Sequence, residues 1–250
     1  MSAYLQLSDI QVSFNGFLAL NHLNLEVNKG ELRCLIGPNG AGKTTALDLI
    51  CGKIKHTAGS VAFDGIMLDG LEDYEIARAG VGRKFQVPSV FRELTVGENL
   101  LVARAKHPGV FGNLRPGYRR ADDEAVERLA VLVGLEDHLN MPASFLSHGQ
   151  TQWLEIGMLV AQDAALILMD EPTAGMTSQE TQKTADLFLR LKGRHTLIVV
   201  EHDIGFVKAI GDVISVMHLG RLLAQGTASE VESNPEVRKA YLGSGGITNA

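Results

Sequence analysis

The chain has 250 residues, of which 45% are hydrophobic, so it can bury a full core as one large domain or as one domain with an insert. Its net charge of −6 argues against a nucleic-acid-binding protein that relies on bulk positive charge, and no uncharged apolar run approaches the roughly 18–20 residues of a membrane-spanning helix. The N-terminus lacks a signal-peptide pattern, and Cys34 and Cys51 are predicted to be small buried side chains in a reducing cytosol.

Residues 4–27 alternate between apolar and polar side chains, with a turn signal at Asn15 and Gly16. A period of two is typical of strands, and it predicts an antiparallel subsheet at the start of the chain. Phe14 lies next to the turn. It either stacks on an adenine ring or is a core or edge aromatic, and this segment alone favours the second interpretation.

A glycine-rich stretch follows the strand-like residues 31–36 and precedes the helix-like residues 46–52. In this context the pattern G-x-x-x-x-G-K-[ST] predicts a phosphate-binding loop, because backbone N–H groups and the positive end of the next helix face the same anion. Lys43 is expected to reach the β- and γ-phosphates of a nucleotide, and the Thr44 hydroxyl to bind Mg²⁺. The loop residues are Gly37, Pro38, Asn39, Gly40, Ala41, Gly42, Lys43, Thr44 and Thr45.

Between residues 59 and 150, strand-like patterns give way to helical ones. A short strand is predicted over 59–65, and another that starts at Gly80 runs into a loop at Gln86. Residues 88–150 then look like a helical insert between two parts of an α/β core. The helices expected in this part of the chain span 72–79, 95–106 and 122–133, with a loop over 107–120.

A helix is predicted to begin at Ser147, because Ser147 and Gln150 have the spacing of a capping box. Its positively polarised end would carry a serine hydroxyl at the tip. The apolar run that follows, 165–169, fits a buried parallel strand. It ends in Asp170 and Glu171, at the sheet edge where open α/β folds bind ligands.

These two acids and a later histidine are candidates for chemistry. Asp170 suits contact with Mg²⁺, and Glu171 suits positioning and deprotonating an attacking water, although both could instead be solvated turn acids. A last buried strand over 195–200 leads to His202, which can donate a hydrogen bond to a γ-phosphate, although a histidine taken alone is more often a satisfied or exposed side chain. A helix over 177–192 precedes that strand, and a closing hairpin is expected over 213–226.

In this order the motifs closely resemble those of the ATP-binding cassette (ABC) ATPase family, and the resemblance covers about residues 4–243. Several matches in family order are far more specific than any one of them, because independent chance matches multiply. The matches are Phe14 with the adenine-stacking aromatic, residues 37–45 with Walker A, Gln86 with the Q-loop glutamine, residues 146–150 with the signature motif, residues 166–170 with Walker B, Glu171 with the catalytic glutamate and His202 with the switch histidine.

The resemblance implies an α/β fold with a P-loop NTPase (RecA-like) core, an N-terminal antiparallel β-subdomain and an inserted α-helical subdomain. The core would span about residues 4–87 and 160–243, the helical subdomain about 88–159, and a flexible tail 244–250. It also implies roles for single residues. Catalysis would use Glu171, His202 and Lys43, nucleotide binding would add Phe14, Ser147, Gly149 and Gln150 to the loop and Gln86, and Mg²⁺ would meet Thr44, Gln86 and Asp170.

Two positions depart from the family pattern. His148 replaces the usual glycine of the signature, and Thr177 replaces the aspartate that usually ends the loop after Walker B. Thr177 can still cap its helix. Residues 147–158, 174–177 and 235–243 are similar to the urea-transporter branch of the branched-chain amino-acid transporter ATPases, where both departures would be branch features.

The family implies an ATP-hydrolysing subunit that pairs head to tail with a second ATPase subunit and energises a separate membrane permease. It would work at the cytoplasmic face of the membrane with an indirect link to a solute-binding protein, and would bind no nucleic acid. The branch resemblance favours import of urea or amides, with branched-chain amino acids as the alternative. Other possibilities are a soluble ABC ATPase of repair or translation, a small-molecule kinase or GTPase, and a nucleotide-binding module without catalysis.

Overall fold

The computed structural model describes residues 3–84, 89–104 and 118–242 of the chain. Gln86 and residues 107–117 of the expected loop therefore lie outside the described residues. By their contacts, residues divide into two compact units, which are described separately. The first unit comprises Met1–Gly82, Ala165–Pro172 and Phe188–Ala250, and the second comprises Arg83–Ala164 and Thr173–Leu187.

The first unit is organised around a sheet with the strand order β10-β9-β3-β8-β7-β6. β7 (Leu166–Asp170) and β8 (Thr196–Val200) are parallel and buried at every position, as predicted from their continuous apolar sequences. β8 also pairs in parallel with β3 (Leu32–Ile36), so the carboxyl ends of these three strands meet at one edge. The other strands are β6 (Val81–Lys84), which ends in the second unit, β9 (Val213–His218) and β10 (Arg221–Gly226).

A second sheet in the first unit has the order β2-β1-β4-β5 and is antiparallel. This confirms the subsheet predicted from residues 4–27. β1 (Leu5–Phe14) and β2 (Phe17–Val27) bury alternate side chains over much of their length, which explains the period of two in the sequence. The remaining strands are β4 (Ala58–Phe63) and β5 (Ile66–Met67).

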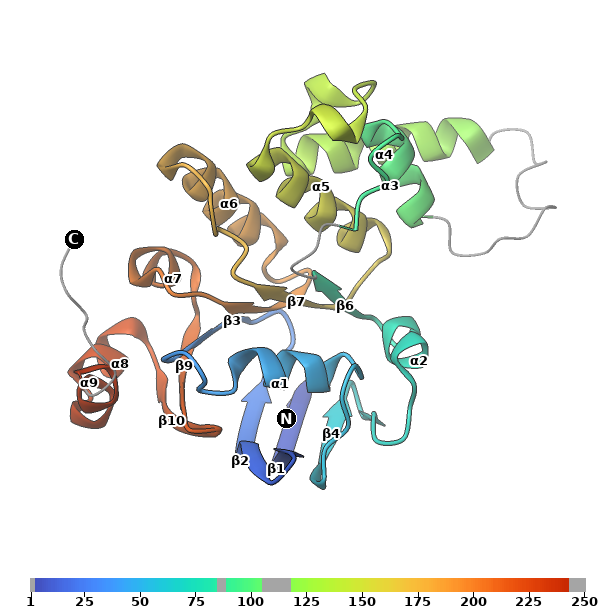
Figure 1. Ribbon diagram of the computed structural model, residues 1–250. Helices are drawn as coiled ribbons and strands as arrows, with labels where there is room; N and C mark the ends of the chain where they lie inside the picture. Colours follow the sequence, from blue (N-terminus) through green and yellow to red (C-terminus); the bar gives the residue numbers. More distant parts are fainter. Residues whose placement is uncertain (1–2, 85–88, 105–117, 243–250) are drawn as a thin grey trace. The chain divides into compact units, whose positions relative to one another are not determined.

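Helix α1 (Lys43–Ile50) packs into one apolar cluster with residues of both sheets. Leu47 and Ile50 of the helix share this cluster with Leu25 of β2 and Ile198 of β8, and Figure 1 shows α1 beside β1 and β2. Each fully buried leucine or isoleucine stabilises the fold by about 1.5–3 kcal/mol, so the cluster holds the start of α1 firmly in place. The unit also contains α2 (Asp73–Arg78), α7 (Ile204–Ile210), α8 (Ala228–Ser233) and α9 (Pro235–Leu242).

The second unit is helical. Its main helices are α3 (Val96–Arg104), α4 (Tyr118–Val133) and α5 (His148–Ala161), and α6 (Ser178–Leu191) begins in it. The helices approach closely at Gly157, where a Cβ atom would lie 3.1 Å from Leu100 and 3.2 Å from Val133. α5 begins directly after Ser147, as predicted, whereas α4 begins at Tyr118, inside the range expected to be a loop. Two short 3-10 helices span Glu136–His138 and Ala143–Phe145.

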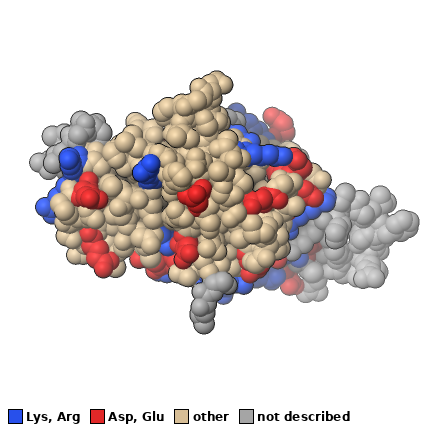
Figure 2. Space-filling view, turned by 90° about the horizontal axis from the view of Figure 1, so that it is seen from below, with Lys and Arg blue, Asp and Glu red and all other residues tan. Residues whose placement is uncertain are grey.

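The described surface carries charges of both signs. Figure 2 shows lysine and arginine side chains interspersed with aspartate and glutamate on one face, without a broad basic area on the part of that face that is described. This agrees with the net charge of −6. Within the described ranges, no helix combines the length and the apolar character needed to cross a bilayer.

Candidate functional site

The loop between β3 and α1 has a backbone that glycine alone adopts readily. Gly37, Gly40 and Gly42 have φ values of 152°, 76° and 101°. A Cβ atom at Gly37 would lie 2.2 Å from the Met217 carbonyl oxygen, and one at Gly42 would lie 2.7 Å from the Ala19 carbonyl oxygen. A Cβ atom at Gly40 would meet no atom within 4 Å. The loop is therefore pressed against protein at Gly37 and Gly42 and faces open space at Gly40.

The wall behind the loop comes from two distant parts of the chain. The Gly220 N–H donates to the Ala41 carbonyl oxygen at 2.9 Å, and the Asn21 N–H donates to the Gly220 carbonyl oxygen at 2.9 Å. The β9–β10 turn thus links the loop to β2. Sequence reasoning identified the turn but gave it no part in the site, because its pairing with the loop is non-local.

The amino end of α1 suits an anion. Its N-cap residue is Gly42, which has no side chain to accept the first N–H groups, and the first turn contains no acidic residue. Such an end offers uncapped backbone donors and a partial positive charge. Thr44 is exposed and Thr45 half-buried within this turn. The loop and helix together therefore fit a polyphosphate.

Lys43 is the first residue of α1, and its ammonium group lies over the loop. Its Nζ donates to the carbonyl oxygens of Gly37 at 2.7 Å and Pro38 at 3.2 Å. Burial lowers the pKa of Lys43, while the nearby negative charges of Glu171 and Asp170 raise it and oppose that effect. The Lys43 ammonium group is thus held at the predicted phosphate loop, near the carboxylates of Glu171 and Asp170.

Two acids end β7 beside this lysine. Asp170 is 3% exposed, whereas the Glu171 side chain is 44% exposed. Glu171 has a φ of 48°, which strains a residue other than glycine, and such strain clusters at functional sites. The Glu171 N–H donates to the Val200 carbonyl oxygen at 2.9 Å, and this bond holds Glu171 beside the end of β8.

His202 follows β8 and meets Glu171. Its Nε2 donates to Glu171 Oε1 at 2.9 Å, and the His202 side chain is 45% exposed. The parallel pairing of β7 and β8 therefore brings together the acid and the histidine that the sequence placed 31 residues apart. Lys43, Asp170, Glu171 and His202 all lie in the first unit.

The predicted signature residues lie in the second unit, at the amino end of α5. The Ser147 hydroxyl oxygen accepts from the Gln150 N–H at 3.2 Å, and Gln150 Oε1 accepts from the Ser147 N–H at 2.9 Å. This confirms the predicted capping box. Ser147 is exposed at the tip, and Gly149 is buried.

The two residues that depart from the family pattern both make specific contacts. His148 Nε2 donates to the Ala174 carbonyl oxygen at 3.0 Å. Thr177 caps α6, where its N–H and hydroxyl donate to Glu180 Oε2 at 3.0 and 2.9 Å. The departures thus have structural roles within the second unit.

Glu180 makes a contact with Ser147 that the sequence analysis did not predict. The other oxygen of its carboxylate accepts from the Ser147 hydroxyl at 3.2 Å. Hydrogen bonds from Thr177, chiefly from its backbone N–H, lower the pKa of Glu180. The sequence indicated that Thr177 can cap its helix, but no local pattern indicated the contact of Glu180 with Ser147.

Aromatic residues mark the tip of the β1–β2 hairpin. Phe14 is 47% exposed and pairs across the hairpin with Phe17, which is 67% exposed. The exposure of Phe14 argues against a core position on this segment. Phe17 was not singled out from the sequence, and it offers a second exposed ring at the same tip.

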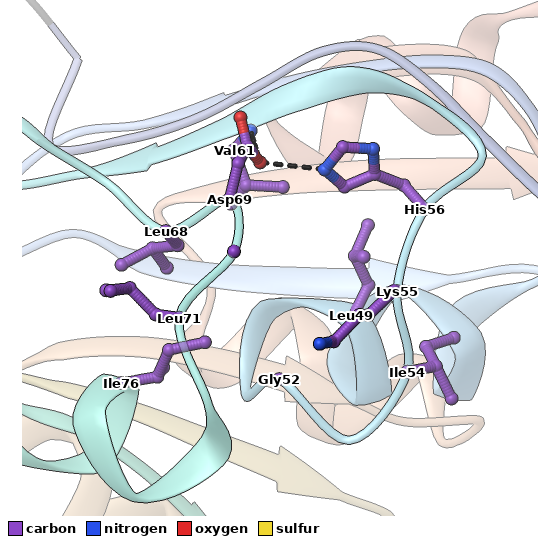
Figure 3. Close-up of a pocket in the computed structure, with 11 residues that line it drawn as sticks. Leu49, Gly52, Ile54, Lys55, His56, Val61, Leu68, Asp69, Leu71 and Ile76 are labelled. Carbon is purple, nitrogen blue, oxygen red and sulfur yellow. Dashed lines mark hydrogen bonds and ion pairs between the residues drawn. The ribbon is translucent and has the colours of Figure 1, made fainter.

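A cavity of about 180 Å³ lies at the carboxyl end of α1, and none of the phosphate-loop residues 37–45 lines it. Figure 3 shows aliphatic side chains around it, and His56 Nε2 donating to Asp69 Oδ1 at 2.7 Å along its edge. Ligand pockets usually measure about 300–1,000 Å³, so this cavity is too small to be the nucleotide site. Its aliphatic lining comes from Leu49, Ile54, Val61, Leu68, Leu71 and Ile76.

This sequence is similar to those of known proteins along almost its whole length. Residues 20–174 match the family model described as ABC transporter, and residues 221–247 match one described as branched-chain amino acid ATP-binding cassette transporter. The chain is 40% identical to the high-affinity branched-chain amino acid transport ATP-binding protein LivG of Escherichia coli (strain K12), over 96% of this chain and 97% of the relative. It is 38% identical to the corresponding protein BraF of Pseudomonas aeruginosa, with the same coverage.

Solved structures agree with the fold. The ADP conformation of MJ1267, an ATP-binding cassette of an ABC transporter, is similar with a TM-score of 0.84 and 30% identity, over 97% of this chain and all 100% of that one. A nucleotide-free cassette from an ABC transporter is similar with a TM-score of 0.80 and 31% identity, over 96% and 98% of the two chains. The predicted α/β cassette fold is thereby confirmed, and the chain belongs to the ABC transporter family as one of its ATPases.

Proposed function

We propose that this chain is the ATP-hydrolysing subunit of an importer for branched-chain amino acids. The observation that carries the proposal is the 40% identity over 96% of the chain to a branched-chain amino acid transport ATP-binding protein. The separate match of residues 221–247 to a branched-chain amino acid cassette model supports the same solute class.

In this proposal, residues 37–45 hold the phosphates of ATP. The exposed side of the loop at Gly40 and the uncapped amino end of α1 support this role. Lys43 neutralises phosphate charge, and the exposed rings at the hairpin tip, Phe14 foremost, offer a surface for the adenine. Thr44, Gln86 and Asp170 would hold Mg²⁺, which would supply positive charge to stabilise the transferred phosphate.

Glu171 is the proposed general base. Its exposed carboxylate stands at the end of β7, and a water that it orients can attack the γ-phosphate while the proton passes to Glu171. His202 holds Glu171 through the 2.9 Å hydrogen bond, and in this proposal its ring also donates to the γ-phosphate. This arrangement supports hydrolysis over mere nucleotide binding.

Each chain has one phosphate loop and one signature helix end. We propose that the end of α5, with Ser147, Gly149 and Gln150, serves the nucleotide of a second subunit packed head to tail. A solved structure at 26% identity is the dimeric post-hydrolysis state of the ATP-binding cassette MJ0796 bound to ADP and Pi. Closing on ATP and opening after hydrolysis would then drive a permease at the cytoplasmic face of the membrane. Residues 4–243 form the ATPase domain in this proposal, and a solute-binding protein delivers the solute.

Urea or amides are the second candidate solute. Residues 147–158, including His148, favour them because they are similar to the urea-transporter branch. The hydrogen bond of His148 to Ala174 supports the view that His148 is a normal feature of that branch and not a defect in the signature motif. The relatives described above name branched-chain amino acids instead, and they support that solute more strongly.

The test is ATP hydrolysis by the chain assembled, in vesicles, with the permease and solute-binding protein of its own transporter. We expect leucine, isoleucine or valine to stimulate hydrolysis and uptake, and urea to leave both unchanged. Stimulation by urea alone would replace the first solute with the second. An assembly that never hydrolyses ATP would contradict the proposed role altogether.

A further inference from the structure

Glu180 joins two functional segments of the second unit. One carboxylate oxygen accepts from the N–H and hydroxyl of Thr177, at the start of α6, and the other accepts from the Ser147 hydroxyl, at the start of α5. The carboxylate also lies against Gly149, where a Cβ atom would be 2.5 Å from Glu180 Oε1. A negative charge thus occupies the amino end of α5.

A serine hydroxyl has a single proton to donate. In this structure the Ser147 proton is donated to Glu180, at 3.2 Å. It cannot at the same time be donated to a phosphate, and a carboxylate beside the same helix end repels an approaching anion. The end of α5 is therefore occupied by an internal acceptor that a phosphate would have to replace.

We propose that Glu180 is a positioning residue that holds the Ser147 hydroxyl and sets the ATP concentration at which two copies of the chain close. This inference rests on the proposed function, in which Ser147 serves the nucleotide of the second subunit. Breaking the contact between Ser147 and Glu180 is then part of closure. Because the Glu180 carboxylate also accepts from Thr177 at the cap of α6, loss of its contact with Ser147 should also affect Thr177 and the loop at Ala174 that His148 contacts.

The chain offers a matched control at Glu230. Glu230 completes the capping box of α8 as Glu180 completes that of α6: the N–H and hydroxyl of Thr227 donate to its Oε2 at 2.7 and 2.9 Å. Hydrogen bonds from the cap lower the pKa of both glutamates. Glu230 lies in the first unit and has no contact with Ser147 among the described hydrogen bonds, so it separates loss of a cap from loss of that contact.

The experiment uses the full chain carrying Glu171→Gln, in which ATP is bound but not consumed. The fraction of dimer is measured by analytical ultracentrifugation as Mg-ATP is raised. Adding Glu180→Gln is expected to lower the ATP concentration for half-maximal dimer about tenfold, the size of effect typical of a hydrogen bond to a charged group. Adding Glu230→Gln is expected to change it less than about twofold, although both variants lose a similar amount of thermal stability.

An unchanged or higher ATP concentration for the Glu180→Gln protein would overturn the inference, as would an equal shift for Glu230→Gln. Glu180→Ala provides a second variant without the charge, with the same expected direction, if Glu180→Gln does not fold. A Glu171→Gln parent that binds Mg-ATP but stays monomeric would overturn the proposed function, and the inference with it. The two failures are distinguished because the second is seen before Glu180 is altered.

Discussion

Replacing Gly37 by alanine should destabilise the chain far more than replacing Gly40, although both glycines lie in the same loop. At Gly37 the new Cβ would lie 2.2 Å from the Met217 carbonyl oxygen, well inside van der Waals contact, at a φ of 152°. Backbone strain costs about 1–3 kcal/mol, and overpacking about 1–3 kcal/mol more. We therefore expect Gly37→Ala to lower the free energy of unfolding by about 2–6 kcal/mol, out of a typical total of about 5–15 kcal/mol.

Gly40→Ala is the matched variant. Its φ of 76° is also positive, but a Cβ there meets no atom within 4 Å. The expected loss is only the backbone term, about 1–2 kcal/mol. The methyl group would instead project into the space proposed for phosphate, so Gly40→Ala should weaken ATP binding by at least about tenfold.

Urea unfolding followed by far-UV circular dichroism gives the free energies, and calorimetry gives the affinity for Mg-ATP. Gly37→Ala should be the less stable variant, whereas Gly40→Ala should lose only the smaller backbone term of about 1–2 kcal/mol but should also lose affinity for Mg-ATP. If Gly37→Ala were as stable as Gly40→Ala, the packing of the loop against the Met217 carbonyl would be wrong. If Gly40→Ala bound ATP like the unaltered chain, the open side of the loop would not be the phosphate site.

Three further predictions concern single side chains. Glu171→Gln should reduce ATP hydrolysis by at least about a hundredfold because the general base is lost, and full-rate turnover in a phosphate-release assay would remove Glu171 from that role. Lys43→Ala should reduce ATP affinity by at least about tenfold in calorimetry, since a buried cation is lost, and unchanged binding would count against the loop assignment. Burial raises the pKa of Tyr241 from 10.0 to about 12, so the unfolded chain ionises first and stability falls as pH rises between these values. Tyr241→Phe should remove that alkaline loss in urea unfolding, whereas Tyr74→Phe, at a side chain 55% exposed, should not.

The elements that were predicted correctly are those with local signals. The alternation in residues 4–27, the apolar runs before Asp170 and His202, and the capping box at Ser147 each involve residues close in sequence. The cassette fold followed from their order. α4 begins at Tyr118, earlier than predicted. The prediction placed a loop as far as residue 120 because glycine and proline occur in the preceding residues.

The parts that could not be predicted depend on pairing between distant segments. The wall formed by Met217 and Gly220 depends on the β9–β10 turn, and the contact of Glu180 with Ser147 joins residues 33 positions apart. Neither leaves a periodic trace in one sequence. The hydrogen bond from His202 to Glu171 was likewise set by the pairing of β8 with β7, although both residues had been singled out. Their chemical roles, and those of the loop residues, stay predictions.

The wall behind the phosphate loop has a consequence for synthesis of the protein. Residues 37–45 are translated well before the carbonyl of Met217 and the amide of Gly220, which close the wall. A nascent chain that does not yet include the β9–β10 turn would contain the complete phosphate loop without the wall that supports it. Nucleotide capture by residues 37–45 should therefore begin only after the β9–β10 turn has been translated.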